Sequence, residues 1–176
     1  MSKSSVPQIR AEIETALAAL SGTWRSSSHG RIRLITGSKA AREQLISDLV
    51  NNPPPQVEIG VLTATALFPS LAAFINSPAH PGIKAVGIVA GSLDALAAEG
   101  ARVGRQVLLI CDGVERAPIR PLGFLCRAVN ATVIHVEPGQ PGILLLLLGS
   151  GYGAATRRLT EAWPDAEMGV IGHELA

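Results

Sequence analysis

Runs of apolar residues alternate along this chain with segments in which apolar residues recur every three or four positions. Gln106–Asp112 holds the unbroken apolar run Val107 to Cys111 and stops on an acid. Such a run is typical of a strand buried on both faces of a sheet, and residues 143–148 have the same character. Because open α/β sheets bind ligands at the carboxyl ends of their strands, Asp112 stands where binding chemistry is expected.

The other segments give an alternating series of predicted strands and helices. Strands are predicted at residues 31–36, 57–62, 106–112, 132–136 and 143–148, with an edge strand at 168–171. Helices are predicted at residues 6–20, 40–50, 67–75, 83–100, 122–129 and 154–163, although the start of the fourth, at 85–89, also fits a strand. Strands that alternate with helices pair in parallel through right-handed crossovers. The predicted fold class is therefore α/β, with three layers and helices on both faces of a mainly parallel sheet.

A polar stretch separates the first predicted helix from the rest of the chain. Residues 26–30 read Ser-Ser-Ser-His-Gly, which is typical of a loop. The predicted organisation is an N-terminal amphipathic helix with its linker, residues 1–29, in front of one α/β domain, residues 30–176. The pattern leaves open whether that helix docks on this domain or on a partner.

Composition restricts the classes of function. Hydrophobic residues make up 47% of the chain, which favours a packed core over disorder. Aromatic residues are only 3% and the net charge is +1, so nucleic acid is a disfavoured partner. No apolar run approaches the roughly 18 residues of a membrane span. Two cysteines without a disulfide framework, and a start without a signal-peptide pattern, predict a cytoplasmic protein.

Three features carry a resemblance to a known family. A strand ends at Gly37 and opens a helix, residues 93–100 lead into the central strand that ends at Asp112, and a helix at residues 121–131 precedes the buried strand that ends at Gly149. Their order resembles that of the P-loop ATPases of the AAA class, especially the bacterial ExeA-type secretion and pilus ATPases and their transposition relatives. The resemblance covers most of residues 30–163 and implies a P-loop NTPase-like fold in a bacterial protein.

The resemblance also predicts a phosphate loop, which this sequence lacks. An active member would read G-x-x-x-x-G-K-[ST], in which glycines admit the phosphates and the lysine binds them. The eight residues from Gly37 read Gly-Ser-Lys-Ala-Ala-Arg-Glu-Gln. Arg42 replaces the second glycine, Glu43 replaces the lysine, and Lys39 falls too early in the motif to substitute for it.

The second half of the expected nucleotide site is also incomplete. Asp112 matches the Asp that supports Mg²⁺, but Gly113 stands where the family has the Glu that activates water, and Glu115 lies two residues further on. The resemblance therefore implies a pseudo-ATPase without catalytic residues or an obligatory cofactor, which acts as an adaptor or regulatory subunit on a protein partner or on itself. Gly37, Ser38, Lys39 and Asp112 are candidates for residual binding of ATP, ADP or another anion; the simpler interpretation is a helix-entry turn and a strand-end cap.

Two alternatives remain open. The first is an enzyme that binds or weakly hydrolyses ATP with an altered phosphate loop. The second is a dinucleotide-binding enzyme, because Gly149, Gly151 and Ala154 satisfy G-x-G-x-x-[GA] between a buried strand and a helix. The acid expected about 20 residues later is missing, since Asp165 comes early and Glu174 late.

Two further groups of residues indicate little chemistry. The four histidines stand apart from each other and from the cysteines, so no metal site is predicted. Arginines gather in sequence on both sides of the central strand, at positions 102, 105, 116, 120 and 127. They indicate a solvated rim of the domain. If they bind a partner, an acidic protein is favoured over a nucleic acid.

Overall fold

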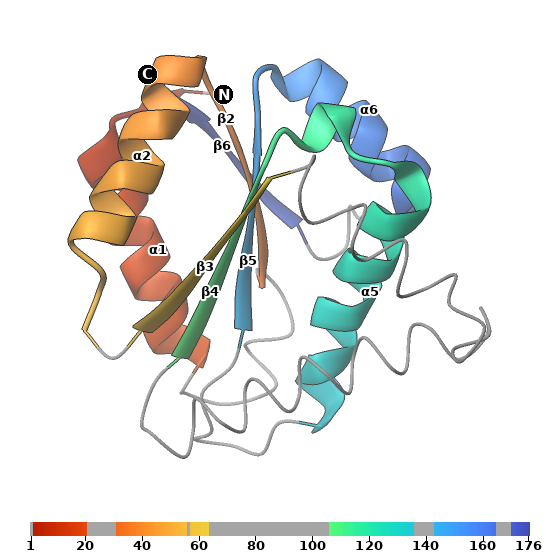
Figure 1. The fold of residues 1–176 in the computed structure, drawn as a ribbon, viewed down its shortest axis with the longest axis horizontal. Coiled ribbons are helices and arrows are strands. Elements are labelled where there is room, and N and C mark those ends of the chain that lie inside the picture. Colours follow the sequence, from red (N-terminus) through yellow and green to blue (C-terminus); the bar gives the residue numbers. More distant parts are fainter. Residues whose placement is uncertain (1, 21–30, 56, 64–105, 136–142, 165–169) are drawn as a thin grey trace.

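The computed structural model describes residues 2–20, 31–55, 57–63, 106–135, 143–164 and 170–176, and these form a parallel sheet between two layers of helices (Figure 1). The sheet has six strands in the order β1-β6-β2-β5-β4-β3, and every pairing is parallel. The strands are β1 (Lys3–Ser4), β2 (Ile32–Thr36), β3 (Val57–Thr63), β4 (Gln106–Asp112), β5 (Ile143–Gly149) and β6 (Val170–Leu175).

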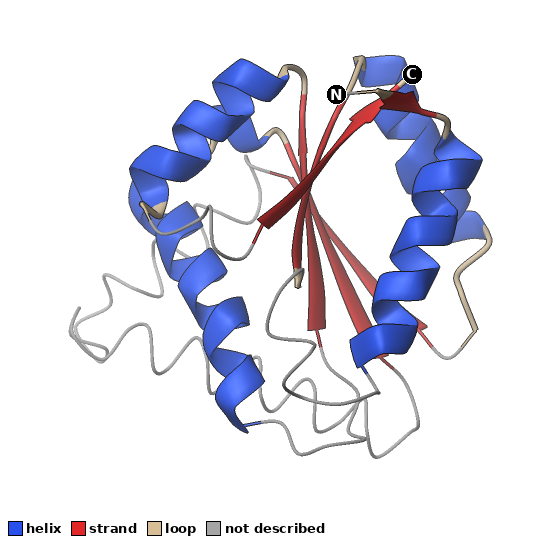
Figure 2. Ribbon diagram, turned by 180° about the vertical axis from the view of Figure 1, so that it is seen from behind, coloured by secondary structure: helices blue, strands red, loops and turns tan. Residues whose placement is uncertain are grey.

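Helices cover both faces of this sheet (Figure 2). The α1 helix (Val6–Leu20) and α2 (Lys39–Asn51) lie on one face, and α5 (Ile119–His135) and α6 (Tyr152–Ala162) lie on the other, with a 3-10 turn, η2 (Val114–Arg116), between β4 and α5. The predicted fold class is confirmed. None of the helices in the described ranges has the length and apolar composition that a membrane span requires.

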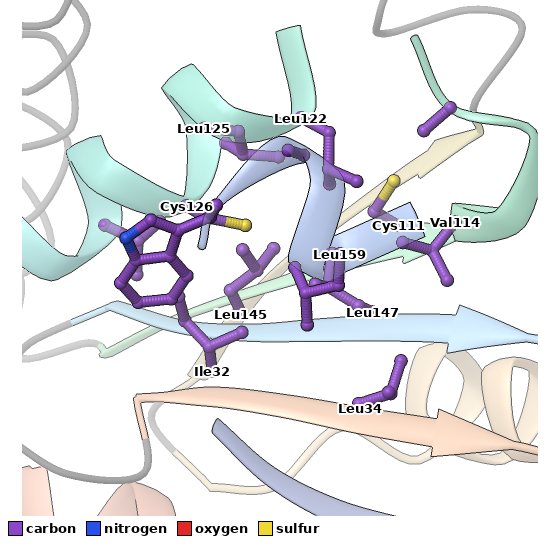
Figure 3. Packing of buried hydrophobic residues seen from close by; sticks show 14 of the residues in the cluster. Ile32, Leu34, Cys111, Val114, Leu122, Leu125, Cys126, Leu145, Leu147 and Leu159 are labelled. Atoms are coloured by element: carbon purple, nitrogen blue, oxygen red, sulfur yellow. The ribbon is translucent and has the colours of Figure 1, made fainter. Parts of the chain in front are cut away.

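Burial on both faces of the sheet explains the unbroken apolar run of β5. Along β5, Leu144, Leu146 and Leu148 contribute to the core under α1 and α2, whereas Leu145 and Leu147 contribute to the core under α5 and α6. All five are fully buried. Figure 3 shows Leu145 and Leu147 in the second core. Because each successive side chain enters one apolar layer or the other, no position of the strand can be polar.

The N-terminal helix packs against the sheet of this domain. Ile9, Ile13 and Leu17 of α1 are buried in the same core as β5, and β1 before the helix pairs with β6. The strand β1 was not predicted, because two residues, one of them charged, carry no strand pattern. The predicted boundary between residues 29 and 30 lies outside the described residues and stays a prediction.

Two sequence predictions about strands are wrong. The predicted strand at 132–136 is the end of α5, which continues to His135. Its β-branched residues favour a strand locally, but extending an existing helix adds one hydrogen bond per residue and outweighs that preference. The predicted edge strand at 168–171 is β6, which lies between β1 and β2 rather than at the edge. The predicted helices at 67–75 and 83–100 lie outside the described residues.

The α5 and α6 helices approach closely where Gly123 faces the end of α6. A Cβ atom at Gly123 would lie 2.4 Å from the carbonyl oxygen of Ala162, which is closer than atoms can approach without a backbone shift. Helices cross most closely where a side chain is absent, so Gly123 determines the distance between these two helices.

We expect Gly123→Ala to lower the free energy of unfolding by about 2 kcal/mol, because the added methyl group overpacks the crossing. Urea denaturation measures the change. Gly153→Ala is the matched control: Gly153 lies in α6 with no atom within 4 Å of its Cβ position, and alanine there should be neutral or stabilise by roughly 0.5 kcal/mol. Equal effects of the two variants would contradict the close crossing.

Both cysteines lie in the core under α5 and α6 (Figure 3). Burial, with a smaller contribution from Asp112, raises the pKa of the Cys111 thiol from 9.0 to about 12. Burial also raises the pKa of Cys126. The native chain therefore keeps both thiol protons at a pH at which the unfolded chain has lost them.

This difference predicts that stability falls as the pH rises above 9, since the unfolded state binds fewer protons than the native state there. Each thiol contributes a slope of about 1.4 kcal/mol per pH unit until its native pKa is reached. Urea denaturation of the wild type and of the Cys111→Ala/Cys126→Ala variant, between roughly pH 9.5 and 11, should show the steeper decline in the wild type. Identical slopes would argue against buried protonated thiols.

Candidate functional site

The predicted site residues meet at the carboxyl edge of the sheet, where β2, β5 and β4 end side by side. The amide of Gly37 donates to the carbonyl of Gly149 (3.0 Å), and the amide of Gly113 donates to the carbonyl of Leu148 (2.9 Å). These bonds fix the turn after β2 and the turn after β4 on either side of the end of β5. Gly37 and Asp112, which are distant in sequence, thereby lie near one another.

The turn after β2 has only two residues, Gly37 and Ser38, because α2 begins at Lys39. The Ser38 hydroxyl accepts a hydrogen bond from the amide of Ala41 (3.1 Å), and the Ser38 carbonyl accepts one from the amide of Arg42 (3.0 Å). A phosphate loop needs free backbone N–H groups over a longer turn. Here the α2 helix occupies most of the motif, and Ser38 at its start accepts hydrogen bonds from two of the N–H groups in the motif.

Gly37 also has a packing role. A Cβ atom at this position would lie 2.7 Å from Cβ of Leu175, whose side chain is buried at the end of β6. The residue is glycine because β6 leaves no room for a side chain, and this reason involves no ligand.

Arg42 occupies the space between the β2–α2 turn and the central strand. Its side chain is 7% exposed; Nη1 forms an ion pair with Oδ1 of Asp112, and Nε donates to the carbonyl of Gly37 (3.2 Å). One guanidinium therefore joins the two halves of the expected nucleotide site. The Asp112 carboxylate, which the resemblance assigned to Mg²⁺, has an internal cation as its partner.

Lys39 and Glu43 point away from this arrangement. Their side chains are 82% and 62% exposed and pair with each other at 3.7 Å. Of the four candidates, Gly37, Ser38 and Asp112 thus share one set of contacts with Arg42, and Lys39 stays on the surface. The sequence indicated that Arg42 would obstruct phosphate; it did not indicate the pairing with Asp112, because β5 separates the two strands that precede these residues.

The turn after β5 is closed in a similar way. The carboxylate of Glu115 accepts hydrogen bonds from the amide (3.3 Å) and the hydroxyl (2.9 Å) of Ser150, just before α6. Gly113 adopts a left-handed conformation (φ 85°) and starts the η2 turn that carries Glu115 there. A Cβ atom at Gly149 would lie 2.9 Å from Oε2 of Glu115. The glycine therefore leaves room for the Glu115 side chain.

This geometry gives the dinucleotide hypothesis no support. A dinucleotide places its pyrophosphate at the helix N-terminus, and Glu115 already provides an anion at the start of α6. Of the two acids considered for the ribose, Glu174 pairs with Lys3 at 3.8 Å, and Asp165 lies outside the described residues. Over the described ranges, no group of three His, Cys, Asp or Glu residues is placed to hold a metal ion.

Comparisons with known proteins identify the fold. No protein-family model matches the chain, and no curated protein matches it either. Among solved structures, it is similar to PCH-2 of C. elegans, with a TM-score of 0.58 and 14% identity over 97% of this chain and 42% of that one. It is also similar to the Aeropyrum pernix ORC2 protein in its ADPNP–ADP complexes, with a TM-score of 0.56 and 18% identity over 96% of this chain and 46% of that one.

The chain shares the P-loop NTPase-like α/β fold of these structures. It spans less than half the length of either. At such low identity the similarity establishes the fold, and the activity has to be argued from the site. The finer resemblance to ExeA-type ATPases stays a prediction.

The Arg42–Asp112 pair predicts a measurable energetic coupling. We expect Arg42→Ala and Asp112→Ala each to lower the free energy of unfolding by about 2 kcal/mol, because each leaves the other charge unpaired. The double variant should lose less than the sum, by roughly 1 kcal/mol or more.

Urea denaturation of the four proteins in this cycle measures the coupling. The exposed pair of Lys39 and Glu43 supplies the matched control, with an expected coupling below about 0.5 kcal/mol. Additive losses at Arg42 and Asp112 would show that the ion pair contributes nothing to stability.

Proposed function

We propose that this chain is a pseudo-ATPase: a cytoplasmic, non-catalytic domain with a P-loop NTPase-like fold that acts as an adaptor or regulatory subunit in a bacterial complex. The observation that carries the proposal is the ion pair of Arg42 and Asp112. It places a side-chain cation of the protein in the space between the first turn and the central strand, where an active enzyme holds Mg²⁺ and phosphate.

Among the described residues at this site, none is placed to fill the roles that phosphoryl transfer requires. Glu43 stands in place of the lysine and is exposed, and Asp112 is paired with Arg42. Gly113 replaces the catalytic glutamate, and the nearby Glu115 is bonded to Ser150 instead of facing Asp112. Because catalysis of this reaction consists of positioning and charge stabilisation, an arrangement without these groups favours a role other than hydrolysis.

A protein partner agrees best with the surface of the described residues. Ile119 and Tyr152 are large apolar side chains with 41% and 44% of their surface exposed, at the first residues of α5 and α6. Exposed apolar side chains next to polar ones are common in protein interfaces. The low net charge of +1 supports protein binding over nucleic acid.

Nucleotide binding and turnover test this proposal. Purified protein with ATP or ADP and Mg²⁺ should show no shift in Tm, because a bound ligand would stabilise the native state and none is expected to bind. It should also release no phosphate above the Asp112→Asn variant, with an active P-loop ATPase assayed in parallel. ATP turnover that Asp112→Asn abolishes would overturn the proposal in favour of an ATPase with an altered loop.

A further inference from the structure

The two helical layers differ in how their charges are paired. Next to α1 and α2, Arg10 pairs with Glu14 (3.0 Å) and Asp48 (2.9 Å), and Lys39 pairs with Glu43. The elements η2, α5 and α6 carry five arginines, and none of these forms an ion pair with a described residue. We call them the arginine surface: Arg116, Arg120, Arg127, Arg157 and Arg158. The only acids on these elements are Glu115, which is bonded to Ser150, and Glu161.

Three of these arginines lie on the two helices that meet at Gly123. Arg120 and Arg127 lie three residues before and four residues after Gly123, so they share the face of α5 that meets α6. Nη1 of Arg127 lies 3.5 Å from the Cβ position of Gly123. On α6, Arg158 lies four residues before Ala162, whose carbonyl oxygen faces Gly123. The end of α6 meets the first turns of α5 at this point (Figure 1), so Arg120 and Arg127 lie close to the contact between the two helices.

The remaining two arginines and two apolar side chains extend this surface. Arg116 precedes α5 on η2, which packs against α6. Arg157 and Tyr152 line a shallow groove along α6, together with Gly153, Thr156, Thr160 and the acid Glu161. Tyr152 and Ile119 are the large exposed apolar residues of these elements. Arg157 thus lies beside Tyr152, and Arg120 follows Ile119 directly in the sequence.

We propose that the arginine surface binds an acidic protein segment that also carries apolar side chains. Unpaired cations provide the charge complementarity, and Tyr152 and Ile119 provide apolar contact. Arginine binds carboxylates through paired N–H groups and is enriched in protein interfaces, whereas lysine, which is absent from these elements, is depleted there. Nucleic acid is the less favoured partner, because the chain as a whole carries only +1. The inference rests on the proposed function and names the partner's chemistry.

Fluorescence anisotropy with a labelled peptide of repeated Glu-Glu-Leu triplets tests this surface. The wild-type protein should bind this acidic peptide. It should bind the matched peptide of Gln-Gln-Leu triplets at least roughly tenfold more weakly. Arg120→Glu and Arg157→Glu should each weaken binding by roughly tenfold, and Arg120→Gln by less, because it removes a charge without adding an opposing one. The matched control is Lys3→Glu, the same charge reversal on β1, which should change affinity by less than about twofold.

Three results would overturn the assignment: no binding of the acidic peptide, equal binding of the Gln peptide, or equal losses for Arg120→Glu and Lys3→Glu. Tighter binding of a labelled single-stranded DNA, lost on Arg120→Glu, would assign the surface to nucleic acid instead. The circular dichroism spectrum of each variant shows that it is folded, and Arg120→Gln replaces Arg120→Glu if it is not. ATP turnover would refute the proposed function alone, whereas failed peptide binding without ATP turnover would refute only this surface.

Discussion

Burial of the central strands on both faces is the constraint on which the rest of the structure depends. Every side chain of β5 from Leu144 to Leu148 enters one of two apolar cores, so helices are required above and below the sheet. This explains why α1 packs here, since Ile9 and Ile13 cover the face on which Leu144 and Leu146 lie. The same burial aligns the ends of β2, β5 and β4, and it therefore determines which turns can meet.

At that edge, a side chain of the protein lies at the N-terminus of each of two helices. Arg42 lies against the turn before α2 and binds Asp112, and Glu115 binds Ser150 before α6. Helix N-termini at the carboxyl edge of a parallel sheet are the usual binding places for phosphate in such folds. In this chain Arg42 and Asp112 bind each other, and Glu115 binds Ser150, so these contacts join the turns at the edge of the sheet.

The sequence predicted the parts of the fold that depend on repeated local patterns. Unbroken apolar runs located β4 and β5 to within a residue, and helical spacing located α1, α2 and α6. Predictions failed where the local signal was weak or misleading: β1 is too short to carry a pattern, and the β-branched residues at 132–134 continue the α5 helix that begins before them. Long-range pairing was least predictable, because nothing local in Arg42 or Glu115 specifies Asp112 or Ser150 as its partner.

The contact between Gly37 and Leu175 changes what a glycine in this motif signifies. Since the end of β6 excludes any side chain there, the fold by itself requires a glycine, whether or not a nucleotide binds. A motif search that counts this position would then score shared sheet packing as if it were shared chemistry. In this chain the packing of the sheet is therefore sufficient to explain Gly37, and the side chain of Arg42, the sixth residue of the motif, says more about the space available at this edge.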